Sequence, residues 1–388
     1  MSIKLSIIIP SYNRYPLNLC SLYSLENQTV SAKDIEILFI DDCSTDKTSY
    51  LRHYESRYKF TYIRNLKNKG RAASRNIGIA KAKGELLLFL DAEMMVEPDF
   101  LQNHIDHHHH KNRLVVCGTF YHMGVFTMYY PDFSTNQVNH IYRLAHNHSI
   151  PLPTFKRKEA FPIIKKEDID SLNFKKLSFH NPYFSEIANA FGDDLEGYGL
   201  PWTVFLSGNV SLKKDFLLKT GGFDENFKGW GFEDWELGYR LFKNGARIIS
   251  RENIKAYHQE HPVPQKFIKF EMLPNFYLFQ KKHQTFEVSI HVLFLLGLTS
   301  RLQENLIVKE YHMLIRDHPN KFLLLIEVFL NGLDYFAAEL ASVPFKLDQN
   351  LLQQRIKLRN QKIEILKLGK YSNFLHAFNL VTKKMHLQ

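Results

Sequence analysis

Short apolar runs alternate with segments of helical periodicity in the N-terminal part of the chain, and this alternation restricts the fold more than any other feature. The apolar runs are 5–9, 35–40, 60–63 and 85–90, and the helical segments between them are 16–28, 45–58 and 72–82, the last closed by Gly84 as a C-cap. Apolar strands joined through helices pair in parallel beneath covering helices. We therefore predict an α/β fold with a mostly parallel sheet flanked by helices.

The pattern changes twice further along the chain. Residues 130–200 carry scattered proline, histidine, lysine and aromatic residues and are predicted to form an insertion over the sheet. Regular secondary structure is predicted again in 202–212, in a helix that begins near Gly231 and in a last strand around 248–249. Beyond Pro264 the periodicity is helical, which predicts a main domain of 1–265 and a helical C-terminal region of 266–388.

The composition excludes several classes of protein. Apolar residues make up 45% and charged residues 23% of the chain, as in globular proteins. The three cysteines, Cys20, Cys43 and Cys117, are too few for a disulfide framework, and neither a signal peptide nor a membrane-spanning run is recognisable. We therefore expect a cytoplasmic protein. An excess of 50 Lys and Arg over 40 Asp and Glu favours polyanionic partners, such as nucleotides, phosphate-rich polymers or an anionic membrane surface.

Polar clusters follow three of the predicted strands, at the edge where an open α/β sheet binds its ligands. They are 10–14, 41–46 and the segment from Asp91 to Glu93. Two carboxylates two residues apart can bind one divalent cation, and oxygen ligands favour Mg²⁺ or Mn²⁺. The alternatives are that Asp41 and Asp42 cap the next helix and that Asp91 and Glu93 lie in a solvated turn.

These clusters resemble those of family 2 glycosyltransferases of the GT-A (Rossmann-like) fold, in the sequences SIIIPSYNR, FIDDCSTD and NKGRAASRNIGIAKAKGELLLFLDAE. The resemblance implies a nucleotide-sugar donor, and the residues that match its base-binding positions are Pro10, Tyr12, Arg14, Asp41 and Asp42. Gly70, Arg71 and Asn76 match the segment near the nucleotide and its phosphates. Asp91 and Glu93 match the metal-binding D-x-D, with Glu as the second acid.

A second series of motifs extends the resemblance to about residue 265. The segment 205–211, with Gly208 and Asn209, resembles the strand that lines the donor sugar. The sequence GWGFEDWE at 229–236 resembles the W-G-x-E-D-x-E segment of galactosyl-, N-acetylgalactosaminyl- and chondroitin-type transferases. That resemblance implies that Trp230, Gly231 and Glu233 bind the acceptor. It also implies that Asp234 is the base and that Glu233 is the other catalytic candidate. The insertion 130–200 then lies on the acceptor side.

The residues around Asp234 support this assignment independently. Trp235, Gly238, Tyr239 and Phe242 have helical spacing, so Asp234 lies in a first helical turn, where the helix N-terminus favours an ionised carboxylate. The alternative is that both acids only balance the helix dipole.

Histidines follow the last predicted strand in the sequence AYHQEHP. In relatives a histidine here completes the metal site, which makes His258 the third expected ligand beside Asp91 and Glu93, and His261 the second candidate. The alternative is a structural histidine. The run 107–110 is expected to be an exposed helix end.

These features predict an inverting, Mn²⁺- or Mg²⁺-dependent hexosyl- or N-acetylhexosaminyltransferase. It would move a sugar from a nucleotide diphosphate, which the resemblance implies to be UDP, to a carbohydrate hydroxyl in bacterial-type surface polysaccharide or glycan synthesis. The alternative from another class is a catalytically inactive nucleotide-sugar-binding scaffold. A nucleotidyltransferase would need a glycine-rich basic loop after the first strand, and no nucleic-acid-reading motif is recognised.

The end of the chain is basic, with nine Lys or Arg against two acids from Phe345 onward. An apolar helical face is predicted from Leu351, Leu352, Ile356, Ile363, Leu366 and Leu368. Two interpretations remain open. The face packs on the catalytic domain or a second subunit of a homo-oligomer, or it lies on the anionic inner face of a membrane.

Overall fold

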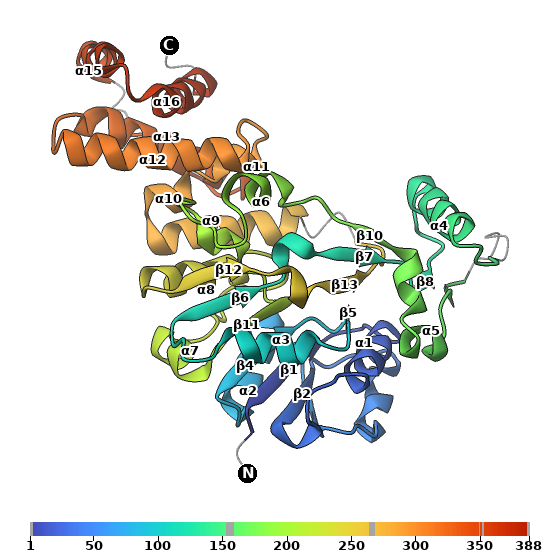
Figure 1. Cartoon of the computed structure of the whole chain (residues 1–388). Helices are drawn as coiled ribbons and strands as arrows, with labels where there is room; N and C mark the ends of the chain where they lie inside the picture. Colours follow the sequence, from blue (N-terminus) through green and yellow to red (C-terminus); the bar gives the residue numbers. More distant parts are fainter. Residues whose placement is uncertain (1–2, 153–158, 264–267, 349, 351–352, 386–388) are drawn as a thin grey trace.

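The computed structural model describes residues 3–152, 159–263, 268–348, 350 and 353–385 (Figure 1). Its main sheet has seven strands in the order β12-β6-β11-β4-β1-β2-β3. The bounds are Leu5–Ser11 (β1), Ile35–Asp41 (β2), Lys59–Arg64 (β3), Leu86–Leu90 (β4), Leu114–Cys117 (β6), Asn209–Lys213 (β11) and Arg247–Ser250 (β12). Only β11 runs antiparallel to its neighbours β4 and β6. The predicted mostly parallel sheet is confirmed.

The sheet is buried on both faces, as its apolar strands predict. In β1, Ile8 packs into one hydrophobic cluster, whereas Ile7 and Ile9 pack into the other, because successive side chains point to opposite faces. Helices α1 (Leu17–Glu26), α2 (Arg71–Lys81) and α3 (Phe100–His107) connect and cover the strands.

Three local predictions are wrong. Residues 45–58 form only a short 3₁₀ helix, Lys47–His53, because Glu26 accepts hydrogen bonds from the Ser56 hydroxyl and the Arg57 amide and fixes the chain after it in an irregular path. The C-cap of α2 is Ala82 and not Gly84. Gly84 instead lets the chain approach β1, since a Cβ there would lie 2.6 Å from the Ser6 nitrogen.

The third correction concerns the strand that carries His258. The strand β12 is not the last, because β13 (Ala256–Gln259) follows in a second sheet of order β10-β7-β13-β5. The other members are β5 (Met94–Val96), β7 (Met123–Val125) and β10 (Ser178–His180). Antiparallel pairing with β5 sets His258 opposite Met94, next to the predicted metal ligand Glu93.

The segment 130–200 forms the predicted helical and irregular insertion. Its elements are α4 (Thr135–Asn147), β9 (Phe161–Pro162), α5 (Lys166–Asp170), the 3₁₀ helix Asn173–Leu177, β10 and α6 (Ser185–Phe191). Strand β9 pairs with β8 (Met128–Tyr129). In Figure 1, α4, β8 and α5 form a lobe beside the second sheet. The segment 202–212 is a 3₁₀ turn, Pro201–Val204, followed by β11.

The C-terminal region is helical, as predicted. After a π-helical turn, Ile268–Met272, the helices are α9 (Leu273–His283), α10 (Phe286–Ser289), α11 (Val292–Leu295), α12 (Arg301–Asp317), α13 (Leu323–Leu340), α15 (Arg355–Leu368) and α16 (Ser372–Lys384). One hydrophobic cluster runs from Ile8 of the sheet to Val381 of α16. Residues beyond 265 therefore share the core of the main domain.

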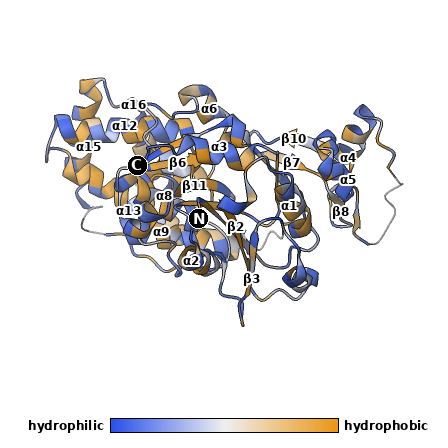
Figure 2. Ribbon diagram, turned by 60° about the horizontal axis from the view of Figure 1, so that its bottom comes forward, coloured by the Kyte–Doolittle hydropathy of each residue, from blue (hydrophilic) through white to orange (hydrophobic). Residues whose placement is uncertain are grey.

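The residues of the predicted apolar face of the basic helix are divided between packed and exposed positions. In α15, Ile365 is buried and Leu358 and Leu368 pack partly against the core, whereas Ile356 and Leu366 are 81% and 57% exposed. Leu351 and Leu352 lie outside the described residues. Figure 2 shows α15 with alternating polar and apolar positions. Among the helices that the structure describes, none combines the length and apolar character needed to cross a membrane.

Candidate active site

The two acids of the D-x-D lie at the carboxyl end of β4, in the turn before β5. The Asp91 amide donates to the Gly208 carbonyl at 3.2 Å, which joins this turn to the start of β11. Gly208 also lies against the Asp91 side chain, since a Cβ there would lie 2.9 Å from Asp91 Oδ2. The structure thus brings together Gly208 and Asp91, two residues predicted for the donor site.

A residue that sequence reasoning did not single out, Arg75 of α2, links the predicted catalytic groups. Its guanidinium contacts Asp91 Oδ1 at 3.0 Å, Glu233 Oε1 at 3.1 Å and Asp234 Oδ1 at 3.6 Å. The Arg75 side chain is 1% exposed and lies over the ring of Phe223. One signal was present in the sequence: Arg75 shares the helical face of Ala72 and Ile79, so a charged residue occupies a buried position.

The Glu233–Asp234 pair begins α8 (Glu233–Lys243), as predicted. Asp234 accepts hydrogen bonds from the Ser207 amide at 3.1 Å and the Ser207 hydroxyl at 2.5 Å. Burial and the charge of Glu233 raise the pKa of Asp234 to about 7, against the opposing effects of Arg75 and Ser207. The expected ionised carboxylate is therefore only partly favoured at neutral pH, because burial and a neighbouring acid outweigh the helix N-terminus.

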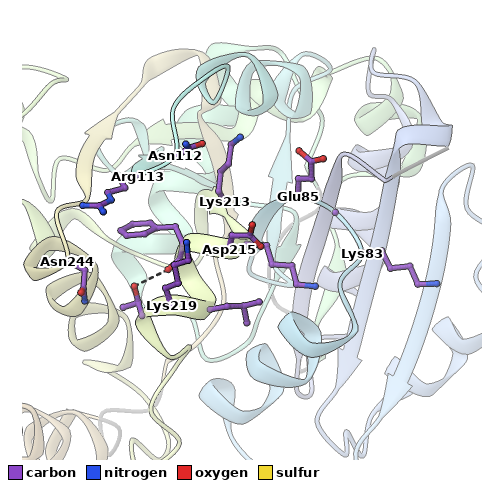
Figure 3. A pocket seen from close by; sticks show the side chains of 13 residues that line it. Lys83, Glu85, Asn112, Arg113, Lys213, Asp215, Lys219 and Asn244 are labelled. Carbon is purple, nitrogen blue, oxygen red and sulfur yellow. Dashed lines mark hydrogen bonds between the residues drawn. The ribbon is translucent and has the colours of Figure 1, made fainter.

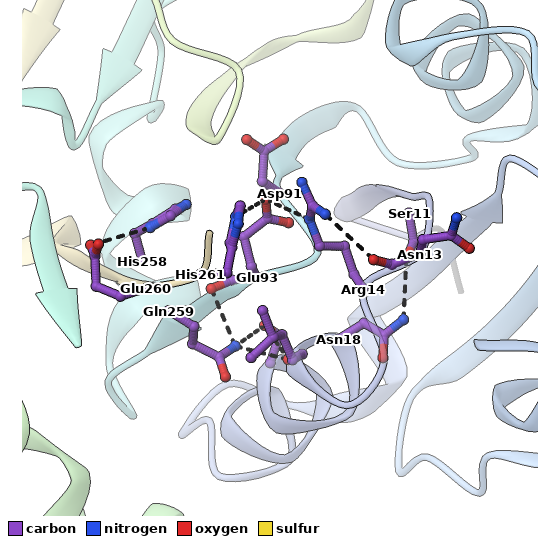
Figure 4. A network of polar contacts seen from close by, with 12 residues as sticks. Ser11, Asn13, Arg14, Asn18, Asp91, Glu93, His258, Gln259, Glu260 and His261 are labelled. Atoms are coloured by element: carbon purple, nitrogen blue, oxygen red, sulfur yellow. Dashed lines mark hydrogen bonds and ion pairs between the residues drawn. The ribbon is translucent and has the colours of Figure 1, made fainter. Parts of the chain in front are cut away.

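A second cluster gathers Glu93 with both candidate histidines (Figure 4). One ligand atom each of Glu93, His258 and His261 lie within 4.8 Å of one another. Glu93 Oε1 is 3.1 Å from Arg14 Nε and 3.6 Å from His261 Nε2. Burial alone would raise the pKa of Glu93, but Arg14 and the two histidines hold it well below its ordinary value. The carboxylate is thus ionised, as a metal ligand must be.

Asp91 is not a member of that cluster. Figure 4 shows it beside Glu93 and the histidines, but one of its oxygens is bound to Arg75. Asp91 therefore lies between the Glu93–His258–His261 cluster and the Glu233–Asp234 pair.

Burial would lower the pKa of His258, but Glu260 and Glu93 outweigh the effect of burial and raise that pKa.

The predicted base-binding residues lie where β1 and β2 end. Tyr12 is 45% exposed, and Arg14 pairs with Glu93. Asp41 is buried and accepts hydrogen bonds from Tyr62, Arg64 and the Ser44 amide, which fold this edge. Asp42 accepts from Asn65 and from the Lys69 and Gly70 amides, and so shapes the loop before α2. Pro10 lies in β1, and Arg71 is the first residue of α2.

Two predicted site residues have side chains that serve the fold. The Asn76 amide bonds to the Phe223 backbone and to Glu225 Oε1, which anchors the loop before Trp230. The Asn209 amide bonds to the Ile254 carbonyl and contacts His104.

In the run 107–110, His109 and His110 are exposed, but His108 is buried against Ser211. That part of the helix end is therefore not the exposed segment expected.

Comparison with known proteins decides the family. Residues 6–172 match the model of glycosyl transferase family 2, and residues 192–262 match the model described as the N-terminal domain of galactosyltransferase. The uncharacterized glycosyltransferase YfnE of Bacillus subtilis is 30% identical over 297 residues, which are 75% of this chain and 74% of YfnE. The chain belongs to glycosyltransferase family 2. The predicted family, enzyme class and fold are confirmed.

Other relatives are longer or more distant. The chondroitin synthase of Escherichia coli is 30% identical over 263 residues, which are 66% of this chain and 35% of the synthase. This glycosyltransferase thus aligns with about a third of that relative. The crystal structure of S. aureus TarS 1-349 in complex with UDP-GlcNAc superposes with a TM-score of 0.49 at 16% identity, and the match covers 99% of this chain and 92% of that one.

A separate hollow of about 750 Å³ lies at the opposite edge of the glycosyltransferase's sheet. It is lined by residues that precede β4 and β6 and by α7 (Lys214–Thr220). Figure 3 shows that its charged side chains, among them Lys83, Arg113 and Lys213, spread around the rim and do not converge. None of the predicted site residues lines it.

We predict that Arg75→Met destabilises the glycosyltransferase by about 3 kcal/mol, because three buried or half-buried carboxylates lose their shared counter-charge. Urea unfolding at neutral pH measures this loss. The matched control is Arg247→Met, which removes a solvent-exposed pair with Asp194 and should cost less than about 1 kcal/mol. Equal losses in the two variants would contradict the central role of Arg75.

Proposed function

We propose that this glycosyltransferase moves a sugar from a UDP-linked donor to a hydroxyl of a carbohydrate acceptor with inversion at the anomeric carbon. One observation carries the proposal: a single guanidinium, that of Arg75, contacts both Asp91 of the D-x-D and the Glu233–Asp234 pair. A group that binds the donor diphosphate and a group that can accept a proton are thereby held side by side.

The donor is proposed to lie along the carboxyl ends of β1 and β2. Tyr12 offers an exposed ring for a base, and the loop that Asp42 shapes leads into the N-terminus of α2, which favours phosphate oxygens. The uridine specificity rests on the family resemblance. The name of one relative, chondroitin synthase, supports a glycan acceptor and a role in polysaccharide synthesis.

A divalent cation fits the residues beside the donor. Glu93, His258 and His261 offer three ligand atoms within 4.8 Å of one another, and Asp91 lies next to them. A mixed set of carboxylate and imidazole ligands favours Mn²⁺ over Mg²⁺. When bound, the cation would neutralise charge on the departing diphosphate.

The chemical step is assigned to Asp234. Its carboxylate, oriented by two hydrogen bonds from Ser207, takes the proton of the acceptor hydroxyl as that hydroxyl attacks the anomeric carbon. Glu233, the neighbouring acid, is held by Arg75 and by the Gly231 amide, which leaves it poorly placed as a covalent nucleophile. A single displacement follows, and it inverts the anomeric carbon.

A panel of UDP-sugars tested for UDP release, with Mn²⁺, Mg²⁺ or EDTA, examines the proposal as a whole. Transfer or slow hydrolysis from one donor supports an active enzyme. Tight UDP-sugar binding without any UDP release, across a panel of glycan oligosaccharides as acceptors, would favour the inactive scaffold.

Asp234→Asn should lower turnover by about 10²- to 10⁴-fold, because the amide keeps the shape but cannot accept the proton. Since the base works when deprotonated and its pKa is about 7, wild-type kcat/KM should rise with pH through about 7. Ser207→Ala removes the hydroxyl hydrogen bond to Asp234, which favours the ionised form, and should move this limb to higher pH. An Asp234→Asn variant with full turnover and an unchanged pH profile would contradict the assignment.

Calorimetric titration of Mn²⁺ in the presence of UDP tests the metal ligands. We expect His258→Ala and His261→Ala each to weaken Mn²⁺ binding, by about 10-fold or more, and Asp91→Asn to weaken it together with UDP. His110→Ala, an exposed histidine in the same protein, is the control and should leave the affinity unchanged. If only one histidine variant loses affinity, that histidine alone completes the site.

Peripheral membrane contact is proposed through α15. Ile356, Ile363 and Leu366 are exposed on one side of this helix, among basic residues such as Arg359 and Lys367. Such a surface suits anionic lipid, with about 1 kcal/mol from each basic residue. In sedimentation with phosphatidylserine vesicles at low salt, the wild type should be found in the vesicle pellet and an Ile356→Ser, Leu366→Ser variant in the supernatant. Wild-type protein in the supernatant would contradict the proposal.

A further inference from the structure

The loop before the catalytic pair is held from outside the main sheet, by α9 of the C-terminal region. Asn275, 6% exposed, points its amide nitrogen at three backbone carbonyls of this loop. The distances are 2.9 Å to Lys228, 3.5 Å to Trp230 and 2.9 Å to Gly231. The orientation of the amide is fixed by these partners, because an amide oxygen in its place would face only acceptors.

The loop needs such support because its backbone is irregular. Gly229, Gly231 and Phe232 all have positive φ, of 72°, 102° and 66°. Phe232 is a non-glycine residue in the left-handed region, a conformation that persists only where the surroundings enforce it. The turned chain also directs the carbonyls of Lys228, Trp230 and Gly231 toward one amide, that of Asn275.

Helix α9 supplies further contacts to the same loop. The ring of Phe232 packs against Phe276 and Phe279, with centroids 5.2 Å and 6.4 Å apart. A Cβ on Gly231 would lie 3.0 Å from the Met272 side chain, so the loop lies directly on the start of α9. Among the described residues of this contact, Asn275 is the one whose side chain donates hydrogen bonds to the loop carbonyls.

We propose that Asn275 is a positioning residue for the acceptor side of the reaction, an inference that rests on the proposed function. By holding the carbonyls of 228–231, Asn275 sets the place of Trp230 and the entry of the acceptor hydroxyl to Asp234. Asn275 lies outside the donor-side clusters around Arg14, Glu93 and Asp42. Its effect is therefore on the acceptor and on turnover, and the affinity for UDP is set elsewhere.

Two variants test the proposal. Asn275→Ala removes the donor, and Asn275→Asp keeps the shape but places a carboxylate against three carbonyls. We expect kcat/KM for transfer to fall by about 10- to 100-fold, expressed in kcat and in the acceptor KM, while the calorimetric Kd for UDP with Mn²⁺ changes less than about twofold. Asn275→Asp should be the more severe.

The matched control is Gln280→Met on the same helix. Gln280 is 1% exposed, and its amide atoms have no hydrogen-bond partner within the described part of the chain. This variant should keep wild-type transfer and wild-type UDP affinity. The proposal would be overturned if Gln280→Met lost as much transfer activity as Asn275→Ala. It would also be overturned if Asn275→Ala lost UDP affinity by the same factor as transfer activity.

Hydrogen exchange separates failure of this inference from failure of the proposed function, because it needs no substrate. Amides of 228–235 should exchange faster in Asn275→Ala than in the wild type or Gln280→Met, with the strands β1 and β4 unchanged. That result supports the positioning contact even where no UDP-sugar in the panel is turned over, an outcome that overturns only the proposed function. Unchanged exchange at 228–235 would overturn the inference.

Discussion

The contact between Arg75 and three carboxylates is the interaction on which the site depends. Asp91 follows β4 and Glu233 and Asp234 begin α8, so one guanidinium joins two parts of the chain that are distant in sequence. With all groups ionised, one positive and three negative charges leave an excess of two negative charges. Burial and the charge of Glu233 raise the pKa of Asp234, and protonation of Asp234 relieves part of this excess.

Much of the fold was predictable because the sheet is apolar on both faces. The runs at β1, β2 and β4 and a helix opening near Gly231, which the structure begins at Glu233, followed from local patterns alone. The errors arose where a distant residue decides a local conformation. Glu26 fixes the path of the chain after Lys47–His53. Glycine occupies position 84 because the chain there packs closely against β1, and not because a helix ends there. No local pattern contains those partners.

The candidate site was predictable in its residue types and less so in its connections. The acids and histidines could be named from motifs, but the arrangement of His258 beside Glu93 depends on the pairing of β13 with β5. Strand β13 is four residues long and was not expected, since its sequence AYHQ lacks an apolar run. Arg75 was missed for a similar reason: its partners come from β4 and α8, and the helix pattern shows only that its position is buried.

Helix α8, which carries the proposed base Asp234, is held from two sides, and this explains why residues beyond 265 belong to the same core. Arg75 contacts its first residues from the sheet side, whereas Glu236, fully buried on α8, is bound by His283 and Lys282 of α9. Burial would raise the pKa of Glu236, but His283 and Arg240 lower it to about 2, so this carboxylate is ionised at neutral pH. Asp91 is joined to α8 through Arg75, and the loop 228–231 is joined to α9 through Asn275. If the proposed function holds, a change in α9 should therefore alter transfer while the nucleotide site stays intact.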